Sequence, residues 1–277
     1  MSGAALNTPR SADGQNGGSV RIQGGGKIYP VRNGSVTALK DVNVSVAGGE
    51  FISILGPSGC GKSTLLRCVA GLDQLTTGSV TLGGKPIDGP PLDMGFVFQR
   101  DVLLDWLNVI DNVLLPCQIK KLSIAAWEPK ARALLGFIGL KGFELRRPWE
   151  LSGGMRQRVA ICRALLLNPS LLLMDEPFGA LDAMTRDELN LELQDIWLAN
   201  AATVLFVTHS ISEAIFLADR VLVMSRSPGR IVEIIDVVLP RPRPLSVREA
   251  PEFIQYVSHI RRLFEGFGIL RGTHARE

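Results

Sequence analysis

Four short runs of apolar residues along the chain predict strands, at 51–55, 94–98, 171–174 and 203–207. Apolar runs of this length, bounded on each side by turn residues, are typical of strands buried on both faces. Helical spacing of apolar residues lies between the strands, at 62–70 and again at 186–198. Strands that alternate with helices indicate an α/β fold with a mainly parallel sheet.

A longer helical stretch interrupts this alternation. Between about residues 108 and 167 the apolar positions recur at helical spacing, and within 130–140 Leu134, Leu135 and Ile138 share one face. We therefore expect a helical subdomain, inserted into the α/β layer, at about residues 100–165.

Both ends of the chain depart from the pattern. Residues 1–19 carry too few apolar side chains to offset the entropy lost on ordering, which predicts a disordered tail. Prolines and arginines alternate through 239–245, which predicts an extended linker because each proline excludes helix for itself and for the residue before it. A terminal helix at about 251–264 is expected within the remaining segment, 239–277.

Composition narrows the class of protein but not its activity. Apolar residues make up 46% of the chain and the net charge is +3, which fits an ordinary globular protein and gives no reason to expect a nucleic-acid partner. We expect neither a membrane-spanning helix nor a signal peptide, since no apolar run approaches the required length. The 4 cysteines are scattered and only 3 histidines are present, which disfavours a disulfide scaffold or a zinc site and fits a reducing compartment.

The strongest chemical signal is a glycine-rich loop between the strand at 51–55 and the helix at 62–70. It matches G-x-x-x-x-G-K-[ST], a phosphate-binding loop, in the strand–helix context that supports it. Its backbone N–H groups and the helix N-terminus are suited to phosphate oxygens, Lys62 to the β- and γ-phosphates, and Ser63 to Mg²⁺. The candidate ATP-binding residues here are Gly56, Pro57, Ser58, Gly59, Cys60, Gly61, Lys62, Ser63 and Thr64.

Two adjacent carboxylates follow the apolar strand at 171–174. Ligands of open α/β sheets lie beyond the carboxyl ends of the strands, so Asp175 and Glu176 are expected to face the nucleotide. Asp175 suits a partner of Mg²⁺ through water, and Glu176 suits a base that orients and polarises the attacking water.

A second glycine-rich turn lies at 151–158 and leads into a helix. Ser152 is a good N-cap residue, and the N–H groups that follow it form another potential anion site. Two helix starts suited to phosphate in one chain suggest that one of them serves the nucleotide of a partner.

Together these motifs resemble the ATP-binding subunit of an ABC transporter, over roughly residues 20–238. The loop at 56–63 corresponds to Walker A, 151–158 to the family signature and 171–176 to Walker B. The resemblance implies a P-loop NTPase fold with an antiparallel β subdomain beside the parallel core and the helical insertion. It also assigns roles to Tyr29, on which adenine would stack, and to Gln99 of the Q-loop, a further Mg²⁺ ligand. Asp182 falls in the D-loop position, and His209 in that of the switch histidine, which would contact the γ-phosphate and act with Glu176 and Lys62 in catalysis.

Membership of that family would imply partners and cofactors. Two ATPase subunits, identical or merely alike, would pack head to tail around ATP and Mg²⁺, with Ser152, Gly153, Gly154 and Gln157 acting in trans. Separate transmembrane permease subunits would dock near 99–106, a segment that is apolar for a loop, and an extracytoplasmic or periplasmic solute-binding protein would act indirectly. The expected location is the cytoplasmic face of the cell membrane, as a peripheral protein.

Details of several segments resemble one branch of the family. The runs at 175–182, 204–209 and 228–230, and the proline–arginine tail, are similar to the importer ATPases for nitrate, sulfonates and taurine. The alternatives are an importer for another solute, such as a pyrimidine precursor, an exporter, or a soluble ABC ATPase outside transport. The last class commonly has two cassettes or a coiled-coil insertion, and this chain shows neither.

Overall fold

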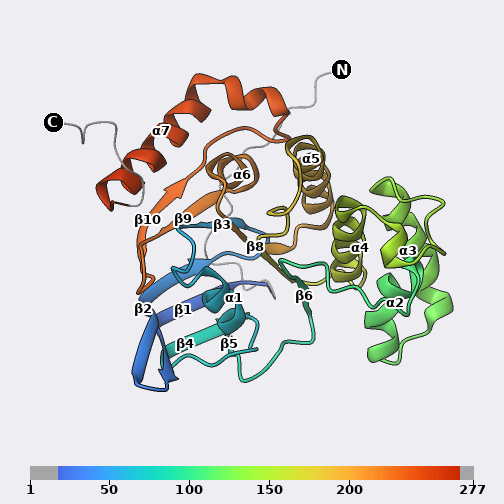
Figure 1. Ribbon diagram of the computed structural model, residues 1–277, viewed down its shortest axis with the longest axis horizontal. Helices are drawn as coiled ribbons and strands as arrows, with labels where there is room; N and C mark the ends of the chain where they lie inside the picture. The colour runs from blue at the N-terminus through green and yellow to red at the C-terminus, as the bar shows by residue number, and fades with distance from the viewer. Residues whose placement is uncertain (1–17, 269–277) are drawn as a thin grey trace.

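The central sheet has six strands, and its order is β10-β9-β3-β8-β7-β6 in a computed structural model that describes residues 18–268 (Figure 1). Strands β6, β7, β8, β3 and β9 pair in parallel, and β10 joins the edge antiparallel to β9. Their bounds are β3 (Phe51–Leu55), β6 (Met94–Val97), β7 (Leu171–Asp175), β8 (Thr203–Thr208), β9 (Arg220–Met224) and β10 (Ile231–Asp236). The expected mainly parallel α/β sheet is confirmed.

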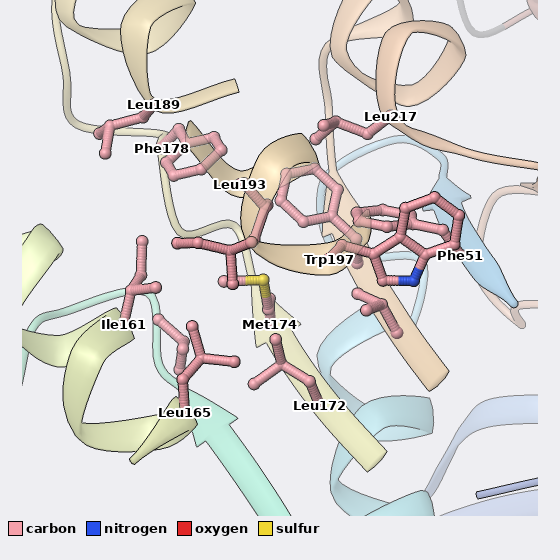
Figure 2. Close-up of a cluster of buried hydrophobic side chains, with 14 of the residues drawn as sticks. Phe51, Ile161, Leu165, Leu172, Met174, Phe178, Leu189, Leu193, Trp197 and Leu217 are labelled. Carbon is pink, nitrogen blue, oxygen red and sulfur yellow. The ribbon is translucent and has the colours of Figure 1, made fainter. Parts of the chain in front are cut away.

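Alternate residues of the inner strands feed two separate cores, which explains why these strands are apolar throughout. Leu172 and Met174 of β7 join a cluster with α4 (Gly153–Leu165), α5 (Ala183–Asn200) and α6 (Ile211–Leu217). Figure 2 shows part of that cluster, with Phe51 beside Trp197. Leu171 and Leu173 join the other cluster, on the face covered by α1 (Lys62–Val69).

A four-stranded antiparallel sheet packs on the α1 side, with the order β2-β1-β4-β5 (Figure 1). Its strands are β1 (Val20–Val31), β2 (Gly34–Val46), β4 (Thr77–Leu82) and β5 (Lys85–Pro86). Residues of β1 and β2 share a buried cluster with α1 and β3. The antiparallel sheet that the resemblance implied is therefore present, and Ala38 of β2 lies next to Gly61 in the loop that precedes α1.

The helical stretch forms a group at one end of the molecule, where α2 (Val109–Ile119) and α3 (Ile124–Phe137) lie beyond α4 (Figure 1). A short 3₁₀ turn, η1 (Pro148–Glu150), leads into α4. In the part of the chain that the structure describes, no helix is long and apolar enough to cross a membrane. The predicted tail lies mostly outside the described residues, which begin at Gly18.

The segment after β10 packs against the protein, which differs from the expectation of a linker. Arg243, between two of its prolines, is 1% exposed and lies against α5 and α6. A 3₁₀ turn η2 (Leu245–Glu249) and α7 (Pro251–Gly266) follow, and Phe253, Ile260 and Phe264 of α7 are buried. The prolines do keep 239–244 out of helix, but arginine contacts bind the segment to the α/β layer.

Candidate functional site

The phosphate-binding loop runs from the end of β3 to the start of α1, and its glycines are required by its shape. Gly59 and Gly61 have φ angles of 75° and 105°, where residues with a side chain are strained. A Cβ on Gly61 would also lie 2.8 Å from the carbonyl oxygen of Ala38. Cys60 is 1% exposed, and burial raises the pKa of its thiol.

Lys62 bends back over this loop. Its Nζ donates to the carbonyl oxygens of Gly56 and Pro57 at 2.9 and 3.0 Å, and its side chain is 5% exposed. The same Nζ lies 3.6 Å from Oε1 of Glu176. The lysine is thus held between the glycine-rich loop and the carboxylates that follow β7.

Both carboxylates occupy the carboxyl end of β7, as expected. Asp175 Oδ1 accepts a hydrogen bond of 2.9 Å from the hydroxyl of Ser63, and burial raises the pKa of Asp175. Glu176 has φ 45°, an uncommon conformation for a non-glycine residue, and its N–H donates to the carbonyl of Val207 in β8. Glu176 Oε2 lies 3.2 Å from Nδ1 of His209. Lys62, Glu176 and His209 therefore converge on one point, although they come from three segments of the chain.

The oxygen atoms beside this point suit a hard divalent cation. A serine hydroxyl and a buried carboxylate, 2.9 Å apart at Ser63 and Asp175, are the donor types that Mg²⁺ accepts alongside water and phosphate oxygens. Within residues 18–268 no group of three or more His, Cys, Asp and Glu side chains forms an all-protein metal cage. Gln99, the third predicted ligand, is exposed just beyond β6 and makes no hydrogen bond to Ser63 or Asp175 in the described part of the chain.

Tyr29 lies near the end of β1, and its ring is held by residues that the sequence did not single out. Its hydroxyl donates to Asp73 Oδ2 at 2.6 Å, while Lys27 Nζ bonds to the other oxygen of Asp73 and lies 4.9 Å from the ring centroid. Burial and the bond to Asp73 raise the pKa of Tyr29, and a hydrogen bond with Thr64, at the end of the glycine-rich loop, opposes the rise. Tyr29 is thereby tied to the phosphate-binding loop.

The second glycine-rich turn caps α4. Ser152 Oγ accepts from Met155 N at 3.3 Å, and Ser152 and Gly153 are exposed. Gly154 is buried, and a Cβ there would lie 2.8 Å from Thr185 of α5. Gln157, further along the same turn, is only 4% exposed in the single subunit.

Asp182 caps α5 close to this turn. Its carboxylate accepts from the N–H and the hydroxyl of Thr185 at 3.0 and 2.7 Å, and these bonds lower the pKa of Asp182. Thr185 is also the residue that Gly154 approaches. The turn at 151–158 and the loop before α5 are therefore in contact within one chain.

The sequence model of the ABC transporter family matches residues 39–179, which hold the glycine-rich loop, the turn at 151–158 and both carboxylates. The chain belongs to the ABC transporter family. Its fold and its motifs are those of the ATPase subunits of that family, so the protein is an ABC ATPase.

Several curated relatives in the family are ATP-binding proteins of importers. The taurine import ATP-binding protein TauB of Burkholderia thailandensis is 49% identical over 205 residues, which cover 74% of this chain and 79% of the relative. The aliphatic sulfonates import protein SsuB of Bacillus licheniformis is 42% identical and covers 89% of this chain and 94% of itself. The nitrate import protein NrtD of Synechococcus elongatus is 44% identical, with 89% and 92% covered.

A solved ABC cassette shares the fold. The dimeric structure of the ATP-binding cassette MJ0796, in a post-hydrolysis state with ADP and phosphate, matches with a TM-score of 0.72 and 33% identity. The match covers 80% of this chain and all of that one, 100%.

Three residues beside the ABC motifs were not predicted: Lys27, Asp73 and Asp101. Asp101 Oδ2 pairs with Arg156 Nε at 2.9 Å and so joins the segment after Gln99 to α4 of the signature. Local sequence spacing could not predict the pairs Lys27–Asp73 and Asp101–Arg156, because the partners are 46 and 55 residues apart in sequence. The ordinary charge of these side chains gives no local hint of the contact.

Proposed function

We propose that this chain hydrolyses ATP to energise import of a small solute, of the taurine, sulfonate or nitrate kind, through separate membrane subunits. The convergence of Lys62, Glu176 and His209 at the end of β7 carries the catalytic part of the proposal. The names of relatives that are 42–49% identical carry the transport part.

Each residue of the site takes a definite role in this proposal. The loop at 56–64 wraps the phosphates, Lys62 neutralises the β- and γ-phosphates, and Tyr29 stacks on adenine. Glu176 accepts the proton of the attacking water, and His209 orients the γ-phosphate. Ser63, Asp175 and Gln99 would hold Mg²⁺, which supplies charge neutralisation at the phosphates when bound.

The site is completed by a second ATPase subunit in this proposal. Ser152 and Gly153 are exposed at the N-terminus of α4, where backbone N–H groups and the helix dipole favour an anion. A head-to-tail dimer places them against the partner's γ-phosphate, and hydrolysis then separates the two subunits. Gln157, which is also predicted to act in trans, is buried in the single subunit.

The permease is proposed to dock beside the segment at 99–106. A groove of about 430 Å³ lies there between β6 and α2, with apolar lining residues such as Met94, Phe96, Phe98, Val102 and Ile119. Phe98, Val102 and Trp106 are 40%, 50% and 71% exposed. An apolar surface next to Gln99 would let a membrane subunit sense the nucleotide from the cytoplasmic face of the membrane.

Reconstitution of the chain with its genomic neighbours tests the proposal. The chain is purified with the adjacent permease and solute-binding protein in liposomes, and ATP hydrolysis is measured against a panel of sulfonates, nitrate and pyrimidine precursors. We expect taurine, another sulfonate or nitrate to stimulate hydrolysis together with uptake. Stimulation by a pyrimidine precursor alone would contradict the proposed solute class, and hydrolysis with no uptake of any solute would contradict the transport role.

A further inference from the structure

The segment after β10 ties together the two helices that lead away from the ATPase site. Asp182 caps the start of α5, and α6 begins at Ile211, just after His209. Arg241 lies 4.4 Å from the ring of Trp197 in α5, and Arg248 pairs with Asp187 of the same helix at 2.5 Å. Residues 239–250, called the strap below, thus run across both helices.

Arg243 is the centre of the strap. Its Nη1 donates to the carbonyl oxygens of Ile215, Phe216 and Ala218 at 2.7, 2.9 and 2.9 Å. These are the carbonyls at the C-terminal end of α6, where the helix carries unpaired acceptors and partial negative charge. The main chain of Arg243 exchanges two further hydrogen bonds with the side chain of Gln194 in α5, at 2.8 and 3.0 Å.

The opposite end of α6 reaches the catalytic loops. Glu213 is 5% exposed, and its Oε2 accepts a hydrogen bond of 2.6 Å from the hydroxyl of Thr208, the residue before His209. Its Oε1 lies 3.3 Å from Arg186, whose guanidinium donates to the carbonyl of Leu181, the residue before Asp182. One buried carboxylate of α6 therefore joins the segments that carry His209 and Asp182.

Stability alone does not account for a buried arginine here. Nε of Arg243 has no hydrogen-bond partner among the described residues, and burial lowers the pKa of this guanidinium to about 9, which leaves it charged at neutral pH. A buried charge is an inefficient source of stability compared with an apolar side chain of similar volume. The burial of Arg243 is better explained by a role in fixing the position of α6 relative to α5.

We propose that Arg243 is a positioning residue of the ATPase site: it fixes α6 against α5, and Glu213 of α6 then sets the places of His209 and Asp182. The inference rests on the proposed function, because it needs these two residues to act on ATP. It gives the strap a role in turnover, beyond attaching α7 to the protein.

Steady-state hydrolysis by the purified full chain tests the inference, with each variant assayed well below its own melting temperature. Arg243→Met removes the cation at similar length, and Arg243→Lys keeps the charge but loses the planar guanidinium with its several donors. Arg261→Gln, at an exposed position of α7, is the matched control. We expect kcat to fall about tenfold in Arg243→Met and less in Arg243→Lys, since small displacements of catalytic groups are costly. The KM for ATP should change less than twofold, because the glycine-rich loop is untouched, and Arg261→Gln should match the wild type.

A second variant keeps the test decisive should Arg243→Met fail to fold. Glu213→Gln retains the acceptor for Thr208 and removes the charge that faces Arg186, so it should lower kcat at unchanged KM. Combined with Arg243→Lys it should cost no more than the larger single effect. Wild-type kcat in the folded variants, or additive losses in the double variant, would overturn the inference while the wild type still hydrolyses ATP. A wild-type chain without hydrolysis would refute the proposed function and the inference with it.

Discussion

At the scale of single residues, the backbone of Glu176 is the most constrained part of the proposed site. Its φ of 45° is strained for a residue with a side chain, and such strain persists only where surrounding contacts hold it. The bond from its N–H to Val207 and the contacts of its carboxylate with Lys62 and His209 supply that support. These contacts hold the carboxylate beside Lys62 and His209, as the proposed role of Glu176 as the base requires.

Asp73 is expected to act on ATP binding through Tyr29. Asp73→Asn weakens the bonds that hold the tyrosine ring, so the KM for ATP should rise about threefold, within the range of an aromatic stacking contact, while kcat stays unchanged. Asp88→Asn, an exposed carboxylate after β5, serves as the control. Equal KM values for Asp73→Asn and the wild type would show that the ring needs no such support.

Asp73 also predicts a dependence of stability on acid pH. Burial opposes ionisation, but the hydrogen bonds from Lys27 and Tyr29 prevail and lower the pKa of Asp73 in the folded protein. A carboxyl group with a depressed folded-state pKa stabilises the fold above its unfolded pKa of about 3.9 and loses this effect as pH falls through the folded value. The urea midpoints of the wild type and Asp73→Asn should therefore converge progressively as the pH falls below about 5. A gap that stays constant over this window would contradict the assignment.

At the scale of elements, local pattern predicted the strands better than the helix starts or the packing of the tail. Strands β3, β7 and β8 are apolar on both faces, and the sequence shows this directly. The helix expected at 130–140 is α3, which begins earlier, at Ile124. It carries Pro129 in its interior, although proline is usually found in the first turn of a helix. Burial of Arg243 was not predictable, since arginines are mostly exposed.

The N-terminus of α4 is expected to serve the partner's nucleotide. Lys62→Ala and Ser152→Arg subunits should each be inactive alone, since each lacks one half of both sites. Mixed in equal amounts, they should recover about a quarter of wild-type hydrolysis, because half of randomly paired dimers are mixed and hold one intact site. Absence of any recovery, with mixed dimers confirmed by tagged pull-down, would mean that Ser152 serves the ATP of its own chain.

At the scale of the whole molecule, we propose two surfaces for partners: the exposed turn at Ser152 and the apolar groove beside 99–106. Both adjoin the nucleotide motifs, one through α4 and the other through β6, and the ion pair between Asp101 and Arg156 connects them. A permease bound at the groove would thus be linked to the turn that contacts the other subunit. The sequence indicated both surfaces through the family resemblance, whereas their link depends on a contact between distant residues.

Trp106 lies in the segment at 99–106, beside the groove, and provides the test of the proposed docking surface. Trp106→Glu places a charge on a side chain that is 71% exposed, so it should reduce co-purification with the permease at least about tenfold, as loss of a buried aromatic contact does at interfaces. Hydrolysis by the isolated chain should be unaffected. Val238→Glu, at a residue 76% exposed in the segment after β10, is the control. Undiminished binding of the permease to Trp106→Glu would exclude this docking surface.

The central claim, that Glu176 activates water for ATP hydrolysis between two subunits, is tested most directly by Glu176→Gln. The amide keeps the size of the side chain but cannot accept the proton, and general-base catalysis is commonly worth about 100-fold or more. We expect ATP to bind with wild-type affinity and to trap a stable dimer, seen by size-exclusion chromatography, while steady-state hydrolysis falls by at least that factor. Hydrolysis at the wild-type rate in this variant would contradict the account.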